Sequence, residues 1–184
     1  LEIQLGMVGP AALGKEIQDM VHDFRGIPKA NGWQNQIGNE LGFNFVGERR
    51  IRLEAGNIGR GWEADAIANG GFVLGNVSTY ANMGIEGRFG YNLPQDFGTT
   101  HIRAGGETNI PFLDRRFEGM PREQDYGILL FASVEGRAIA QDIFLDGNTF
   151  SDSHSVDKEP LVADLAMGVK FKIRSFKLSY TTLD

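Results

Sequence analysis

Residues 161–174 read LVADLAMGVKFKIR, and this stretch decides the fold. Every second side chain is apolar, and a period of two is typical of a β-strand with one face in apolar surroundings. The same alternation recurs along the chain and predicts about nine strands. They lie near residues 1–8, 35–46, 48–57, 63–75, 79–90, 126–139, 141–149, 160–174 and 175–184. The chain is therefore predicted to be all-β and antiparallel, with a single domain over residues 1–184.

The predicted connections differ in length. Short turns are expected near residues 46–49, 76–79, 140 and 174, and longer loops at 9–34, 58–62, 91–125 and 150–159. We expect the short turns at one end of the strands and the long loops at the other. This arrangement is typical of an up-and-down barrel, and of outer-membrane barrels in particular.

The alternation alone does not decide which face of the strands meets water. An inward apolar face predicts a soluble barrel or sandwich, whereas an outward one predicts a transmembrane barrel. The sequence contains no run of about 18 apolar residues, so it predicts no transmembrane helix. A transmembrane barrel and a soluble lipid-binding barrel both remain open on this ground.

Composition excludes several classes of protein. The chain has 184 residues, no cysteine and a net charge of −6. Without cysteine it has neither a disulfide framework nor a thiolate metal site. The acidic balance argues against a general nucleic-acid binder, so we expect no nucleic acid among its partners. Because the sequence opens inside a predicted strand and closes in another, we expect it to be truncated at both ends.

One segment departs from the strand pattern. Residues 13–26 read LGKEIQDMVHDFRG, and their apolar residues recur at helical spacing. Pro10 suits the beginning of a helix, whereas Gly26 and Pro28 suit its end. The sequence therefore predicts a short amphipathic helix. Its apolar stripe consists of Leu13, Ile17, Met20, Val21 and Phe24.

His22 lies on the side of this helix opposite the stripe, because successive residues are about 100° apart. Gln18 and Asp19 lie within side-chain reach of it. A histidine on a polar helix face is commonly just solvated. Its pKa near neutrality also suits a general base, which takes a proton from water and returns it to a leaving group. Asp19 is then a candidate to orient the ring.

Other polar clusters carry weaker signals. His101 and His154 each lack a second histidine at ligand spacing, so neither is expected to bind a metal. Residues 146–148 read DGN, which is part of a calcium-loop pattern without its remaining ligands, and we interpret them as a turn. The glycine-rich residues 56–61 precede no helix that would hold a phosphate, and we interpret them as a loop.

Several strings, taken in order, resemble the outer-membrane lipid A 3′-O-deacylase (LpxR) family. Gln18 and His22 are separated by three residues, and residues 32–40 read GWQNQIGNE. Further along, residues 74–82 read LGNVSTYAN and residues 144–150 read FLDGNTF. Ser153, Ser155, Val156, Lys158 and Pro160 continue the match. The resemblance covers nearly the whole chain, and the ordered set is more specific than any one string.

This resemblance implies a twelve-stranded antiparallel barrel in the Gram-negative bacterial outer membrane. It implies an active site between the barrel wall and a helix in an extracellular loop, with His22 as the catalytic residue on that helix. The implied reaction is calcium-dependent hydrolysis of the 3′ acyloxyacyl ester of lipid A, the lipid part of lipopolysaccharide. His22 would activate water, and calcium would stabilise the oxyanion. The implied partners are lipopolysaccharide and the surrounding outer-membrane lipid.

The resemblance also implies what this chain lacks. The family's other active-site residues, an Asn-Asp pair, a Thr and a Lys, precede the helix by more residues than the sequence contains. We therefore expect the isolated 184-residue chain to be inactive and the full-length protein to be an active hydrolase. The calcium ligands remain unassigned. A non-catalytic outer-membrane barrel and a soluble lipid-binding barrel remain as alternatives.

Overall fold

The computed structural model describes residues 1–53, 56–94, 96–98, 126–174 and 176–184. These residues form an antiparallel sheet with little helix, as the sequence predicts. The strands are β1 (Glu2–Val8), β2 (Glu40–Leu53), β3 (Asn57–Gly59), β4 (Trp62–Gly75), β5 (Ser78–Tyr91), β6 (Tyr126–Asp142), β7 (Leu161–Ile173) and β8 (Phe176–Leu183). The helices are α1 (Gly14–Arg25) and α2 (Ile143–Asp146), with 3-10 turns at Pro10–Ala12 and Trp33–Asn35.

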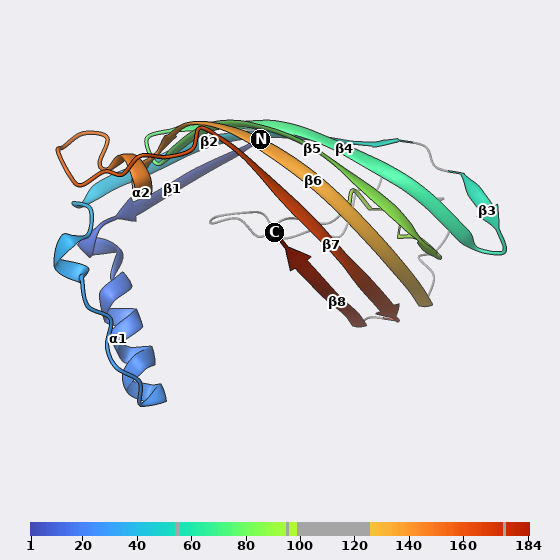
Figure 1. The fold of residues 1–184 in the computed structure, drawn as a ribbon, viewed down its shortest axis with the longest axis horizontal. Coiled ribbons are helices and arrows are strands. Elements are labelled where there is room, and N and C mark those ends of the chain that lie inside the picture. Colours follow the sequence, from blue (N-terminus) through green and yellow to red (C-terminus); the bar gives the residue numbers. More distant parts are fainter. Residues whose placement is uncertain (54–55, 95, 99–125, 175) are drawn as a thin grey trace. The chain divides into compact units, whose positions relative to one another are not determined.

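The strands follow one another in the order β1-β2-β4-β5-β6-β7-β8, and β3 pairs with β4 (Figure 1). The path of paired strands begins at β1 and ends at β8, so the sheet is open over the described residues. In the first pair Gly6 lies opposite Gly42, and in the last Ile173 lies opposite Phe176. No helix among the described residues has the length and apolar character to cross a membrane.

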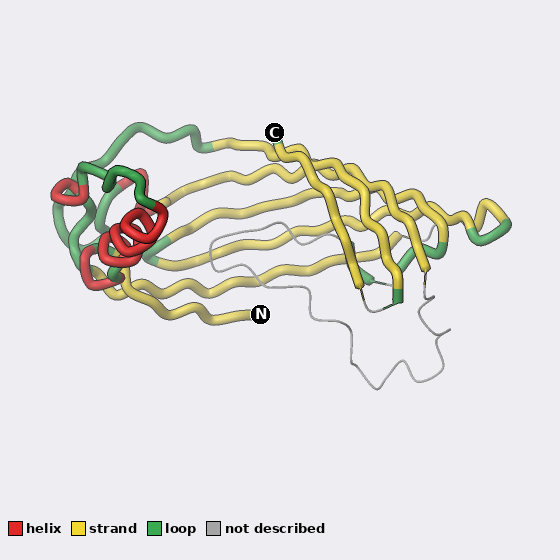
Figure 2. Tube along the Cα trace, turned by 90° about the horizontal axis from the view of Figure 1, so that it is seen from below, coloured by secondary structure: helices red, strands yellow, loops and turns green. Residues whose placement is uncertain are grey.

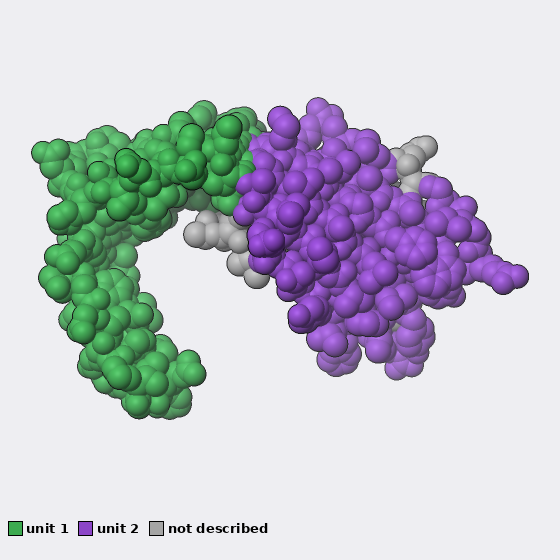
Figure 3. All heavy atoms as spheres, viewed as in Figure 1, with its two compact units in different colours: residues 1–47, 71–81, 137–162 green, residues 48–70, 82–136, 163–184 purple. Residues whose placement is uncertain are grey.

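The chain divides into two compact units (Figure 3). Unit 1 comprises residues 1–47, 71–81 and 137–162, and unit 2 comprises residues 48–70, 82–136 and 163–184. The connections 9–39, 76–77 and 143–160 all lie in unit 1. A two-residue turn therefore lies in the same unit as two long connections, so the predicted separation of short turns from long loops was wrong. The reason is that the turns predicted near residues 46–49 and 140 lie inside strands.

The faces of the strands are inverted relative to a soluble protein. In β5 the polar residues Asn82, Glu86 and Arg88 are buried, whereas Met83 and Ile85 between them are exposed. Met83 is 74% exposed and Arg88 only 3%. Outward apolar residues also alternate along β2, β6 and β7, although the covered face of β6 includes Leu129 and Phe131 beside Ser133 and Glu135. Apolar side chains that face outward along these four strands argue against a soluble barrel and fit a wall surrounded by lipid.

Charges on the inward face of unit 2 pair with one another. Asp65 accepts hydrogen bonds from Arg88 at 2.5 and 2.6 Å and from Arg52 at 2.6 Å. Arg88 also bonds Asp96. The Arg88 and Asp65 side chains are almost entirely buried. The hydrogen-bonded partners meet the requirement that a buried charge be paired.

Three predicted strands are corrected, because those at 35–46 and 48–57 are one strand and that at 141–149 is not a strand. β2 runs unbroken through residues 46–49, where a turn was expected. Gly47 interrupts the alternation because the Phe72 ring lies over it, and an added Cβ would come within 2.6 Å of that ring. The strand predicted at 141–149 is instead α2 and the loop after it. The Asp142 side chain begins α2 by accepting a hydrogen bond from the Phe144 N–H at 3.0 Å.

Candidate functional site

The connection 9–39 in unit 1 carries α1 and is closed at its base. An added Cβ on Gly9 would lie 2.4 Å from the Gly38 carbonyl oxygen, and Gly9 has a φ of 88°. Only glycine combines that backbone conformation with such a close approach. The Ala11 N–H also donates to the Asn39 side-chain oxygen at 2.6 Å. The two ends of the connection therefore lie together.

Local signals set the limits of α1 as the sequence predicts. Pro10 begins a 3-10 turn, and α1 follows at Gly14. Gly26 ends the helix in the left-handed conformation (φ 64°), and its N–H bonds to the His22 and Asp23 carbonyls. The Trp33 ring packs at the beginning of α1, where an added Cβ on Gly14 would lie 3.3 Å from it. Figure 2 shows the helical segments of this unit in red.

His22 lies in the last turn of α1 and is half-buried. Its Nδ1 lies 2.7 Å from the Pro28 carbonyl oxygen. A carbonyl oxygen only accepts, so Nδ1 carries the hydrogen in this contact. The Nε2 atom then holds the lone pair of the neutral ring, and it has no hydrogen-bond partner among the described residues. A histidine fixed in this tautomer can accept a proton at Nε2.

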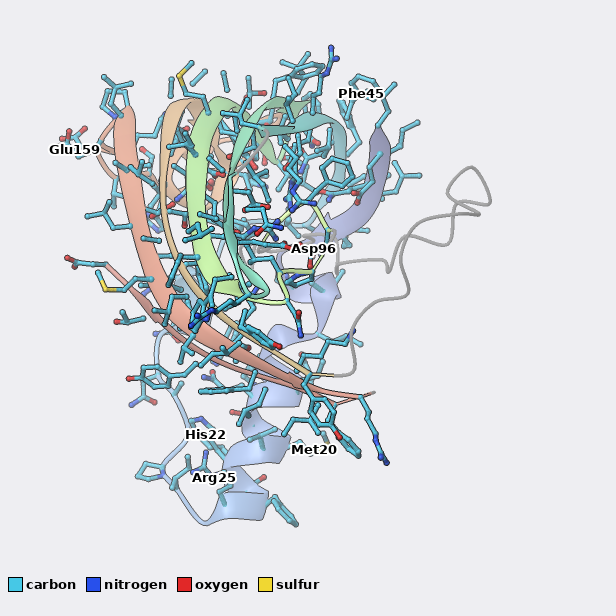
Figure 4. The ribbon with its side chains drawn as sticks, turned by 90° about the vertical axis from the view of Figure 1, so that its right-hand side faces the viewer. Met20, His22, Arg25, Phe45, Asp96 and Glu159 are labelled. Carbon is cyan, nitrogen blue, oxygen red and sulfur yellow. The ribbon has the colours of Figure 1, made fainter. Side chains whose placement is uncertain are left out.

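Asp19 does not orient the His22 ring in the structure. Its carboxylate lies 3.7 Å from the Lys15 ammonium, one turn back along α1. The backbone carbonyl oxygen of Pro28 orients the His22 ring instead, by accepting the hydrogen bond from Nδ1. Figure 4 shows His22 and Met20 on different sides of α1, as the helical spacing predicts.

A second group of residues in unit 1, which we call the Glu40 clasp, joins three segments by hydrogen bonds. These are the beginning of β2, the turn between β4 and β5, and the loop after α2. Glu40 lies at the first position of β2 and is 7% exposed. Its carboxylate accepts hydrogen bonds from the Asn76 side chain at 2.8 Å and from the Asn148 side chain at 3.0 Å. The Thr149 and Phe150 N–H groups donate to the same carboxylate at 3.0 and 3.3 Å. The clasp consists of Glu40, Asn76, Asn148, Thr149 and Phe150.

Asn148 extends the clasp to the base of the helical connection. Its side chain accepts from the Gly38 N–H at 2.7 Å and donates to the Gly38 carbonyl at 3.0 Å. Gly38 in turn meets Gly9. The connection that carries His22 is thus anchored to the loop 147–160 at its base.

Asp146 and Lys158 form an ion pair beside the clasp. The Lys158 ammonium lies 2.6 Å from the Asp146 Oδ2. The same carboxylate accepts from the Asp142 N–H at 2.8 Å. The hydrogen bond from Lys158, followed by that from Asp142, holds the pKa of Asp146 below its ordinary value. Both residues line a hollow of about 650 Å³ together with Ser155, Val156 and Asp157.

The remaining sequence predictions have different outcomes. Residues 146–148 turn the chain after α2, with Gly147 at a φ of 84°. The glycine-rich segment 56–61 contains β3 and the turn of a small hairpin with β4, so the prediction of a plain loop was incomplete. His154 is exposed in the loop 147–160. His101 lies outside the described residues.

The implied calcium ion finds no complete ligand set in this part of the chain. Among the described residues no three His, Asp or Glu side chains gather to hold a metal. The two aspartates of α1 are each paired with a lysine, Asp19 with Lys15 and Asp23 with Lys29. Among the described residues, acidic side chains alone therefore do not assign a calcium site.

An antiparallel sheet with its apolar face outward and its charges inward defines the class of integral outer-membrane β-barrel proteins. The family model described as "Outer membrane protein LpxR" matches residues 1–183, and the chain belongs to this family. Its localisation is accordingly the bacterial outer membrane. No curated protein matches the sequence. The solved structure titled "LpxR from Salmonella typhimurium" shares the fold, with a TM-score of 0.72 and 24% identity. That match covers 98% of this chain and 58% of the other.

Sequence reasoning missed the Pro28 carbonyl and the Glu40 clasp as parts of the site. A backbone acceptor leaves no signal in residue identities, so Pro28 could be identified only as a helix stop. Glu40 and Asn148 did stand in the strings that resembled the family. The available signal was an acidic residue, Glu40, at the beginning of a strand, together with an amide residue, Asn148, much later in the chain.

Proposed function

We propose that the full-length protein hydrolyses the 3′ acyloxyacyl ester of lipid A, with His22 as the general base. The observation that carries the proposal is the 2.7 Å contact of His22 Nδ1 with the Pro28 carbonyl, which leaves Nε2 free to accept a proton. Membership of the LpxR family supports the substrate class. The hydrogen bond to Pro28 supports an oriented ring, whereas a solvated histidine without a catalytic role is the alternative that the experiments below test.

The reaction needs one proton acceptor near the ester. His22 Nε2 takes a proton from water, and the water oxygen forms a bond to the ester carbonyl carbon. When the tetrahedral intermediate collapses, the bond from that carbon to the sugar oxygen breaks. Nε2 then returns its proton to the sugar oxygen. The products are a free acid and a hydroxyl on the sugar, so atoms and charge balance.

The calcium requirement is a separate part of the proposal. When bound, a calcium ion supplies stabilisation of the developing oxyanion. Its ligands remain unassigned, since no three His, Asp or Glu side chains gather among the described residues. Loss of activity with a calcium chelator, and its recovery when calcium is added back, would test this part independently of His22.

Mass spectrometry of lipid A tests the reaction. Cells that express the full-length protein should lose the 3′ acyloxyacyl mass from their lipid A. His22→Ala should slow this loss by roughly 10² to 10⁴-fold, the usual contribution of a general base. The matched control is His154→Ala, because His154 is an exposed histidine of the same unit and lies outside the proposed chemistry.

Other results would contradict the proposal. An unchanged lipid A profile with the folded wild-type protein would favour a non-catalytic outer-membrane barrel. Deacylation that survives His22→Ala would remove His22 from the mechanism while leaving the substrate class in place. Equal loss in both histidine variants would indicate a general defect in folding or insertion.

A further inference from the structure

The apolar stripe of α1 is unburied in the described structure. Phe24 is 92% exposed and Met20 is 65% exposed, and none of the helix residues is buried. The stripe spans about 100° of the helix, which is the width that amphipathic helices usually bury. It consists of Ile17, Met20, Val21 and Phe24; Leu13, which the sequence also placed on the stripe, precedes the helix in a left-handed conformation and is exposed as well.

The helix turns its polar side, and not the stripe, toward its own connection. His22 on that side bonds Pro28, and Gln18 and Asp19 are less exposed than the stripe residues. If the helix were surrounded by water, this orientation would be unfavourable, because apolar side chains would be exposed to water while polar side chains are covered. The orientation is favourable if the surroundings of the stripe are themselves apolar.

The strands of the same unit show which apolar surroundings are available. In β1 and β2, Leu5 is 81% exposed and Leu41 is 71% exposed, while Glu40 is buried. In an outer-membrane protein these outward side chains contact acyl chains. α1 follows β1 after a short 3-10 turn, so the helix begins only a few residues from these outward apolar side chains.

We propose that the stripe of α1 inserts into the acyl layer of the outer membrane, so that α1 is an interfacial helix. Its opposite side carries Lys15, Asp19 and His22 at the level of the headgroups, where such helices keep their polar residues. The lipid contact rests on the exposure of the stripe and on the family's membrane location. One consequence rests on the proposed function: the depth of α1 places His22 where an acyl ester meets its headgroup.

Single-cysteine labelling tests this inference, in a full-length protein from which any cysteine outside these 184 residues has been replaced by serine; the 184 residues themselves contain none. The variants Ile17→Cys, Met20→Cys and Phe24→Cys of the full-length protein carry an environment-sensitive fluorophore on the stripe. Lys15→Cys carries it on the opposite side and is the matched control. The labelled proteins are reconstituted in bilayers of phosphatidylethanolamine and phosphatidylglycerol, and folding is checked by heat-modifiable gel mobility.

Quenching by two agents then distinguishes the possible occupants. We expect lipids with a nitroxide on the acyl chain to quench the stripe labels several-fold more than the Lys15→Cys label, and aqueous iodide to quench them several-fold less. Iodide quenching equal to that at Lys15→Cys would place the stripe in water. Protection from both agents would mean that protein covers it, either another segment or a second copy. Either result overturns the inference, and neither depends on deacylation.

Discussion

At the residue scale, the ion pair of Asp146 and Lys158 makes the stability of the loop 147–160 depend on pH. The pKa of Asp146 is lowered on folding, mainly by the hydrogen bond from Lys158. A lowered pKa means that the folded state binds the proton less tightly than the unfolded state does. The contribution of Asp146 to stability is therefore present above its ordinary pKa and is lost as the pH falls through the folded pKa.

This sign gives a prediction for residues 143–160. Hydrogen exchange of this segment, relative to the rest of the protein, should increase as the pH is lowered from about 6 to about 2.5. Asp146→Asn should remove most of that pH dependence, because an amide does not titrate. Asp157→Asn is the control, since Asp157 lines the same hollow but makes no such ion pair. A pH dependence that persists in Asp146→Asn would assign the effect to another group.

At the element scale, the Glu40 clasp fixes the loop 147–160 to the first residue of β2. One carboxylate accepts hydrogen bonds from two amide side chains and two backbone N–H groups. Removing it leaves several donors unpaired at once. Leaving a partly buried donor unsatisfied costs about 1–3 kcal/mol, so the clasp outweighs any single surface ion pair here.

Glu40→Ala should therefore destabilise unit 1 by on the order of 1–3 kcal/mol. The loss should show in urea unfolding, and the Thr149 and Phe150 amides should exchange much faster than in the wild type. Glu16→Ala is the control, because it removes an exposed carboxylate from α1. If both variants unfold at the same urea concentration as the wild type, the clasp has no energetic role.

The elements differ in how well the sequence predicts them. α1, its end at Gly26, and strands β4 to β8 follow from periodicity and from residues that favour helix ends. β2 was divided in error at residues 46–49, where Gly47 leaves room for the Phe72 ring from β4. That contact joins residues far apart in the sequence, and no local pattern encodes it. α2 was misassigned because a short apolar run fits a strand or a helix equally.

At the scale of the whole molecule, the decisive property is the direction of each strand face. The alternation of apolar and polar residues shows that each strand has two different faces, but not which of them meets lipid or water. The sequence alone therefore did not decide between a membrane barrel and a soluble barrel. The structure resolves the choice because Arg88 and Asp65 pair in a buried position while Met83 faces outward. The family match agrees with this assignment.

An outward charge on a long strand should therefore be costly. Met83 lies in the middle part of β5, and Met83→Arg should destabilise the protein by about 2–4 kcal/mol if it reaches the membrane centre. Unfolding in bilayers measures this loss. Met83→Leu preserves volume and apolar character, so it should remain close to the wild type. A Met83→Arg protein as stable as Met83→Leu would contradict an outward face surrounded by lipid.

The contact of Gly9 with Gly38 has a consequence for how this family can vary. The segment between these two glycines begins and ends at one point, so its length is uncoupled from the spacing of the strands that flank it. For a flexible loop, doubling the length adds only about 0.6 kcal/mol of closure entropy. The helix-bearing segment can thus lengthen, shorten or change its sequence at little thermodynamic cost to the sheet. The segment between Gly9 and Gly38 can therefore evolve separately from the strands that flank it.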